Sequence, residues 1–135
     1  MTDEKNVQMK YLEFQMIQQQ FQQLQQHVEK LDKQMVELEV LKNNLSELGD
    51  VKDGSEILAP ISNGIFAKTE IKDAKNLLIN VGANVVVEKS VDDSIVMIDN
   101  QIKEIRKYYK ESMSQLQDTA IKAEKIREEL MNVVD

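Results

Sequence analysis

Two long stretches of this 135-residue chain carry apolar residues at alternating spacings of three and four, the period of a coiled-coil seam. In the first stretch, from Phe14 to Leu38, every seam position is apolar, and no Gly or Pro interrupts it. Lys10 and Lys42 are the two flaws in the longer pattern, and Gly49-Asp50 supplies a stop signal. The pattern predicts a helix over residues 7–48.

The second stretch begins at Ser90, a residue type suited to cap a helix, and two acids, Asp92 and Asp93, follow it in the first turn. Its seam positions run from Ile95 to Val133 and are apolar or Tyr except for Ser112 and Thr119. The pattern predicts a second long helix that continues to the C-terminal end of the sequence.

The two predicted helices have similar lengths, about 60 to 65 Å each at about 1.5 Å per residue. Equal lengths and matching apolar stripes favour one antiparallel hairpin, since a parallel pair would need the middle segment to cross the whole length. Setting Leu45 opposite Ile95 fixes the register. The other expected neighbours are Leu31 with Tyr109, Phe21 with Thr119, and Phe14 with Ile126.

The middle of the chain has a different pattern, with short apolar runs separated by turn signals. It predicts four strands, at residues 56–61, 65–71, 77–81 and 85–89. Asn63-Gly64 is suited to a type I′ turn, and Pro60 indicates that the first strand lies at an edge or a bulge. We therefore expect a single domain with a first helix in 1–50, two hairpins in 51–89 and a second helix in 90–135.

Two hairpins of this size do not make a stable isolated sheet, because a lone hairpin is marginal in water. Their many apolar residues need a cover that one chain does not supply at that end. We expect the strands to pair with copies or relatives of this chain and to close a shared barrel. The expected assembly residues are Ile57, Leu58, Ile61, Ile65, Phe66, Leu77, Ile79, Val81, Val85 and Val87.

The free ends of both helices carry apolar residues away from the partner helix, whereas the middle of each helix is polar on that side. Clustered exposed apolar side chains mark interaction surfaces, and Met suits varied contacts. Scattered surface residues are the plain alternative. The expected interaction residues at these tips are Val7, Met9, Leu12, Met16, Ile121, Leu130, Met131 and Val134.

Composition and charge exclude several classes of protein. The chain has no Cys, one His and a net charge of −7, which argues against a disulfide scaffold, a metal site, a catalytic triad and a nucleic-acid binder. We expect no enzyme activity and no cofactor. The polar residues 1–6 do not resemble a signal peptide, and no apolar run is long enough to span a membrane. A cytoplasmic protein is the default expectation.

The order helix, two small hairpins, helix resembles the α subunit of prefoldin, and archaeal α subunits in particular. The segments that carry the likeness are Glu56-Ile57-Leu58-Ala59-Pro60-Ile61 and residues 77–90, of which Val81-Gly82 to Lys89-Ser90 is the most specific part. The implied fold is mostly α with small β. A long antiparallel coiled-coil hairpin is joined by two β-hairpins, which assemble into an oligomeric β-barrel body.

The resemblance also implies a function and partners. Prefoldin is a hexamer of two α and four β subunits that holds unfolded proteins at its coiled-coil tips without ATP and passes them to a group II chaperonin. We therefore expect a co-chaperone subunit whose partners are prefoldin β subunits, unfolded client proteins and a group II chaperonin. The alternative is a structural or adaptor coiled coil that binds one folded partner.

Overall fold

The computed structural model describes the backbone of residues 2–134 and the side chains of residues 4–132. The chain forms two compact units. The first contains the chain up to Met35 and from Glu104 onward, and the second contains Val36–Lys103. Helix α1 spans Thr2–Gly49 and helix α2 spans Val91–Val134, so each helix contributes to both units.

Helix α2 begins as the sequence predicts, with Ser90 as its cap. The backbone N–H of Asp93 donates to Ser90 Oγ at 3.0 Å, which satisfies one of the free N–H groups of the first turn. Asp92 and Asp93 place negative charge at the positive end of the helix dipole. Helix α1 begins at Thr2, five residues before the predicted start, because the polar first turn contains no residue that breaks a helix.

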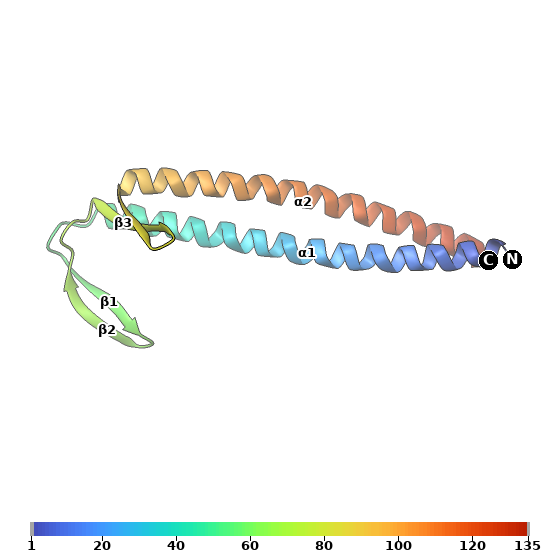
Figure 1. Ribbon diagram of the computed structural model, residues 1–135, viewed down its shortest axis with the longest axis horizontal. Coiled ribbons are helices and arrows are strands. Elements are labelled where there is room, and N and C mark those ends of the chain that lie inside the picture. Colours follow the sequence, from blue (N-terminus) through green and yellow to red (C-terminus); the bar gives the residue numbers. More distant parts are fainter. Residues whose placement is uncertain (1, 135) are drawn as a thin grey trace. The chain divides into compact units, whose positions relative to one another are not determined.

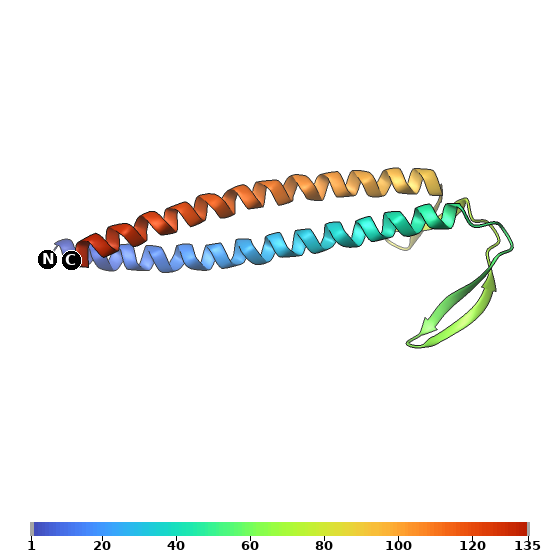
Figure 2. The same cartoon turned by 180° about the vertical axis from the view of Figure 1, so that it is seen from behind.

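In the first unit, α1 and α2 lie side by side in opposite directions (Figures 1 and 2). Lys10 Nζ lies 3.0 Å from a carboxylate oxygen of Glu129. Five seam residues of this unit are buried, and they include the two polar side chains that interrupt the seam of α2, whereas the other described seam residues are half-buried. The buried residues of this unit are Ile17, Leu31, Ser112, Thr119 and Ile126.

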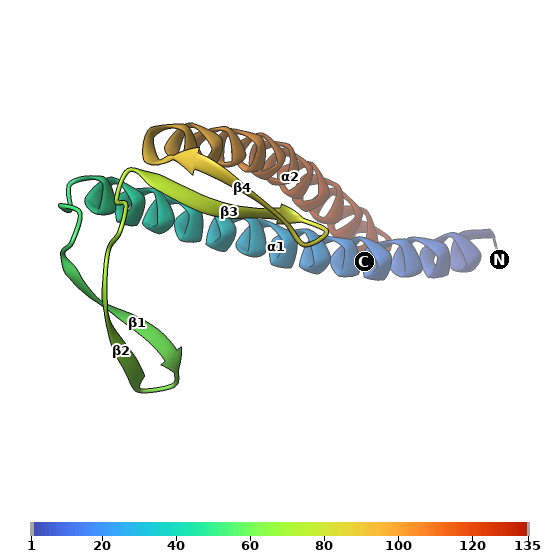
Figure 3. The ribbon, with the colours of Figure 1, turned by 60° about the vertical axis from the view of Figure 1, so that its left-hand side comes forward.

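In the second unit, the ends of the helices are joined by four strands that form two separate antiparallel hairpins (Figure 3). Strand β1 (Glu56–Ser62) pairs with β2 (Ile65–Glu70), and β3 (Asn76–Gly82) pairs with β4 (Val85–Ser90). These bounds agree with the predicted strands to within one residue at each end, and the predicted fold class is confirmed.

The segments between the elements of the second unit are tied together by hydrogen bonds. Gly54 N donates to Ile71 O at 2.6 Å, and Ile71 N donates to Ser55 O at 2.9 Å. Ala74 N donates to the Asp53 carboxylate at 2.8 Å. The buried residues of this unit are Ile71 and Ala74, which belong to these segments, and Val91, Ser94, Ile98 and Ile102 on α2.

The predicted type I′ turn at Asn63-Gly64 is wrong. A type I′ turn needs a positive φ at both central residues, and here only Gly64 has one, at 77°. The pairing of β1 with β2 shifts its register between Pro60 and Ser62, and this shift accommodates a turn in which only Gly64 is left-handed. Both central residues have positive φ in the other hairpin, at Ala83 (51°) and Asn84 (60°). The sequence gives no indication of positive φ at Ala83, because Ala rarely adopts the left-handed conformation.

Candidate functional site

The clearest exposed apolar residues of the first unit are those near the ends of its two helices. Met9, Leu12 and Met16 on α1 and Ile121 and Met131 on α2 are each between 59% and 68% exposed. Their neighbours on the seam, such as Ile17 and Ile126, are buried. We call these five exposed side chains the tip residues.

The tip residues of α1 form one stripe because spacings of three and four place side chains on the same side of a helix. Glu4, Lys5 and Gln8 surround the stripe and keep the surface hydrated. Among the described residues, no side chain covers the stripe, as the exposure of Met9, Leu12 and Met16 shows. Such a surface can bury apolar groups of another molecule.

Three other residues expected at the tips have a different position. Val7 and Leu130 lie on the seam and are half-buried. They would become available only if the helix ends separated. The side chain of Val134 lies outside the described residues. The structure thus separates the eight predicted residues into five that are freely accessible, two seam residues and one that it does not describe.

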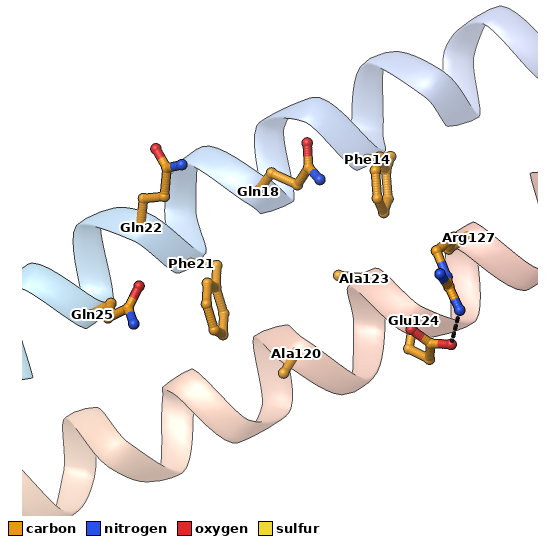
Figure 4. A pocket seen from close by; sticks show the side chains of 9 residues that line it. All are labelled: Phe14, Gln18, Phe21, Gln22, Gln25, Ala120, Ala123, Glu124 and Arg127. Atoms are coloured by element: carbon orange, nitrogen blue, oxygen red, sulfur yellow. Dashed lines mark hydrogen bonds and ion pairs between the residues drawn. The ribbon is translucent and has the colours of Figure 1, made fainter.

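Beside the tip residues, the helices enclose an open hollow of about 440 Å³, which we call the seam hollow (Figure 4). The rings of Phe14 and Phe21 reach from α1 toward α2, and Ala120 and Ala123 lie opposite the stretch between them. Two methyl groups opposite two aromatic rings leave this space unfilled. The polar side chains of the hollow are Gln18, Gln22, Gln25, Glu124 and Arg127.

The charged groups of the seam hollow neutralise each other. Arg127 Nη2 donates to Glu124 Oε1 at 2.9 Å, one turn apart on α2. The other polar groups are uncharged amides, which both donate and accept hydrogen bonds. The seam hollow therefore combines apolar walls with a neutral polar rim.

The β1–β2 hairpin exposes apolar side chains on both faces. Leu58 and Phe66 lie on one face, and Ile57 lies on the other with the half-buried Ala59 and Ala67. Thr69 Oγ1 donates to Ile57 O at 3.0 Å, so the Ile57 carbonyl points toward β2. Backbone groups alternate in direction along a strand, and Pro60 is three residues beyond Ile57. The nitrogen of Pro60, which carries no hydrogen, therefore lies on the side of β1 that faces away from β2.

The β3–β4 hairpin has one half-buried face and one exposed face. Leu77, Ile79 and Val87 are half-buried, whereas Leu78 is 76% exposed. Among the ten expected assembly residues, these three are half-buried and the other seven are exposed. Seven exposed apolar side chains on two short hairpins make a surface that water solvates poorly, so it favours association.

The described residues contain no group of three or more His, Cys, Asp or Glu side chains arranged to hold a metal ion. His27 is exposed. Within the described part of the chain, neither helix is long and apolar enough to cross a membrane.

Sequence reasoning did not identify the seam hollow or the exposed Tyr11. Phe14, Phe21 and Ala123 were expected to be ordinary seam residues. The sequence does contain a signal for the hollow. Two large side chains on α1, Phe14 and Phe21, face small side chains on α2 over the same two turns. Tyr11 is 57% exposed and lies one turn from Phe14, on the same flank of α1.

Comparisons with known proteins agree with this architecture. The family model described as "Prefoldin subunit" matches residues 17–134. The prefoldin subunit alpha of Archaeoglobus fulgidus is 31% identical over 137 residues, covering 96% of this chain and 95% of that protein. The prefoldin subunit alpha of Pyrococcus horikoshii is 31% identical over 124 residues, covering 91% and 81%.

A solved structure shares the fold. The filamentous PFD from Methanocaldococcus jannaschii, determined by cryo-EM, superposes with a TM-score of 0.75 at 17% identity. The match covers 85% of this chain and 95% of that one. The arrangement of two long helices joined by two hairpins thus occurs in a known prefoldin.

Proposed function

Because this chain belongs to the prefoldin family, we propose that it is an ATP-independent holdase subunit that binds unfolded proteins at its tip residues. The exposure of these five apolar side chains is the observation that carries the proposal. Unfolded proteins expose apolar surface, and burying it against the tips is favourable in water. No nucleotide is needed, since release requires only a competing acceptor.

The binding strength of one subunit is expected to be small. Burying roughly 100 Å² of apolar surface per contact yields about 2.5 kcal/mol before ordering costs. Several subunits in one assembly would add their contacts through effective concentration. A client is then held by many weak contacts, and each of them is reversible.

We propose that the hairpins carry the assembly. The exposed residues of β1–β2 and the outer face of β3–β4 would be covered by prefoldin β subunits in a hexamer of two α and four β subunits. Co-expression with a single-hairpin relative is expected to raise the mass of the complex to that of the hexamer. An unchanged mass would contradict this assembly.

Delivery of the client to a group II chaperonin follows from the same proposal, as the step that competes for the bound client. The cytoplasmic location, the lack of enzyme activity and the lack of nucleic-acid binding stay predictions from the sequence. An adaptor that binds one folded partner would differ in a measurable way, because it would not protect unrelated clients from aggregation.

The decisive experiment replaces Met9, Leu12 and Met16 by Ser in the full chain. Aggregation of a chemically denatured client is followed by light scattering after dilution, without ATP. We expect the variant to lose most of its protection of several unrelated clients. A second variant, which lacks residues 1–12 and 128–135, is expected to do the same.

The matched control carries Gln8, Gln15 and Gln26 replaced by Ser, all of them exposed on α1. It has the same number of Ser substitutions in the helix but keeps the apolar stripe, and we expect full protection. The mass of each assembly is compared by light scattering. Full protection by the tip variant would show that the tips do not bind clients.

A further inference from the structure

We propose that the seam hollow binds a short, extended and uncharged segment of unfolded polypeptide, with one aromatic or large aliphatic side chain inserted between Phe14 and Phe21. This inference rests on the proposed holdase function. It adds a second site, distinct in residues from the stripe of tip residues, and it states the class of segment that fits.

The walls of the seam hollow determine the side chain that it accepts. Phe14 and Phe21 are seven residues apart, about 10.5 Å along the helix, and both are half-buried. Ala120 and Ala123 form the opposite wall. An aromatic ring or a Leu or Met side chain would fill this space and bury apolar surface on two sides.

The rim determines the conformation of the bound segment. Gln18 and Gln25 lie on the same flank of α1, and their amides can donate to and accept from a peptide backbone. An extended segment has free N–H and C=O groups to pair with them, whereas a helix uses these groups internally. The rim thus favours an extended occupant.

The length and charge of the site also favour a short, extended segment without acidic residues. Tyr11 continues the apolar track beyond Phe14, so that the track from Tyr11 to Phe21 covers ten residues, about 15 Å. Four or five extended residues span this distance at about 3.3 Å each. Arg127 and Glu124 neutralise each other, and the chain has a net charge of −7, which disfavours acidic segments.

The test fills the seam hollow while leaving the tip residues intact. Ala120→Leu and Ala123→Leu are introduced together in the full chain. Leu is a good helix former at both positions and a usual residue at the seam position Ala123, whereas Ala120 is exposed beside the seam. The melting temperature establishes whether the fold is kept. If the double variant melts lower, Ala120→Leu alone is used.

The probe is a fluorescein-labelled ten-residue peptide of Ser and Gly with a central Leu-Phe-Leu. We expect filling the hollow to weaken its binding about tenfold in fluorescence anisotropy. Replacing four Ser residues of the peptide by Glu is expected to weaken binding to the unaltered chain. The control variant Gln117→Leu adds similar apolar bulk to an exposed position of α2 and should leave binding unchanged.

A second measurement locates the peptide directly. In methyl NMR spectra, the peptide should shift the signals of Ala120 and Ala123 but not those of Ala59 and Ala67. Equal affinity of the filled variant, or unshifted Ala120 and Ala123 signals, would overturn the seam hollow as a site. Helical chemical shifts of the bound peptide would overturn the extended occupant.

The aggregation assay separates this inference from the proposed function. If the filled variant protects clients fully and the tip variant does not, the tips bind clients and the seam hollow does not. If the tip variant protects fully while the filled variant binds the peptide weakly, the seam hollow stands and the tip mechanism fails.

Discussion

Lys42 Nζ lies 2.8 Å from Asp99 Oδ1, joining α1 and α2 in the second unit. Lys42 interrupts the apolar seam of α1, and the sequence alone shows it as a flaw. The structure shows that its ammonium group reaches a carboxylate at the flank of α2. The hydrogen bond to Asp99 and the negative charge of that group raise the pKa of Lys42 above its ordinary value.

We predict that Asp99→Asn lowers the melting temperature slightly at low salt and that the difference disappears at high salt. The effect is small because both side chains are partly exposed, and salt screens exposed pairs. Since the pKa of Lys42 is raised by folding, the pair stabilises the folded state fully below the ordinary pKa of 10.5. This stabilisation is lost as the pH rises through the raised pKa. Thermal melts at two salt concentrations test this, and an undiminished difference at high salt would contradict it.

Replacing Ala83 by Gly is expected to stabilise the chain by about 0.5 to 1 kcal/mol. Ala83 has a φ of 51°, a conformation that costs a residue with a Cβ more than it costs Gly. The free energy of unfolding is measured in guanidinium at a fixed concentration of chain, since assembly shifts apparent stability.

The matched control for this substitution is Ala67→Gly. Ala67 lies within β2, does not have a positive φ, and is half-buried opposite Ala59. Gly there loses conformational entropy and packing, so we expect a destabilisation of about 1 kcal/mol. Equal effects of the two substitutions would show that the backbone conformation of Ala83 is not strained.

The fold could be predicted from the sequence because the seam spacing and the strand runs act over many residues. The exposure of Met9, Leu12 and Met16 followed from the same spacing. The seam hollow could not be predicted in this way, because spacing shows which positions face each other but not whether their volumes match. The turn between β3 and β4 was expected at residues 82–84, but the positive φ of Ala83 was not, because the hairpin imposes this conformation on a residue that rarely adopts it.

Ser90→Ala is expected to destabilise the chain by about 1 kcal/mol. The substitution removes the Oγ that accepts from Asp93 N at 3.0 Å, and the first turn of α2 loses its cap. The Ser90 carbonyl still accepts from Ser94 Oγ, so the local chain path is kept. The control is Ser114→Ala at an exposed position within α2. It should be neutral or slightly stabilising because Ala is the better helix former. Equal losses in unfolding measurements would contradict the capping role.

Asp73 fixes the turn that leads into β3, and its effect should depend on pH. The side-chain amide of Asn76 donates to Asp73 Oδ2 at 2.9 Å, and Lys75 N donates to Oδ1 at 2.9 Å. These hydrogen bonds hold the charged form, the Asn76 amide being the largest cause, and they lower the pKa of Asp73 below its ordinary value of 3.8.

A group whose pKa is lowered by folding stabilises the folded state above its unfolded pKa, and it loses this effect as the pH falls through the folded value. We therefore predict that Asp73→Ala lowers the melting temperature at neutral pH and that the difference shrinks only below pH 3.8. Asn76→Ala removes the main donor, so it should move the pKa of Asp73 back toward the ordinary value in a carboxyl NMR titration. The backbone N–H groups of Lys75 and Asn76 remain, so this return should be partial. An unmoved titration would show that the Asn76 amide does not hold the carboxylate in solution.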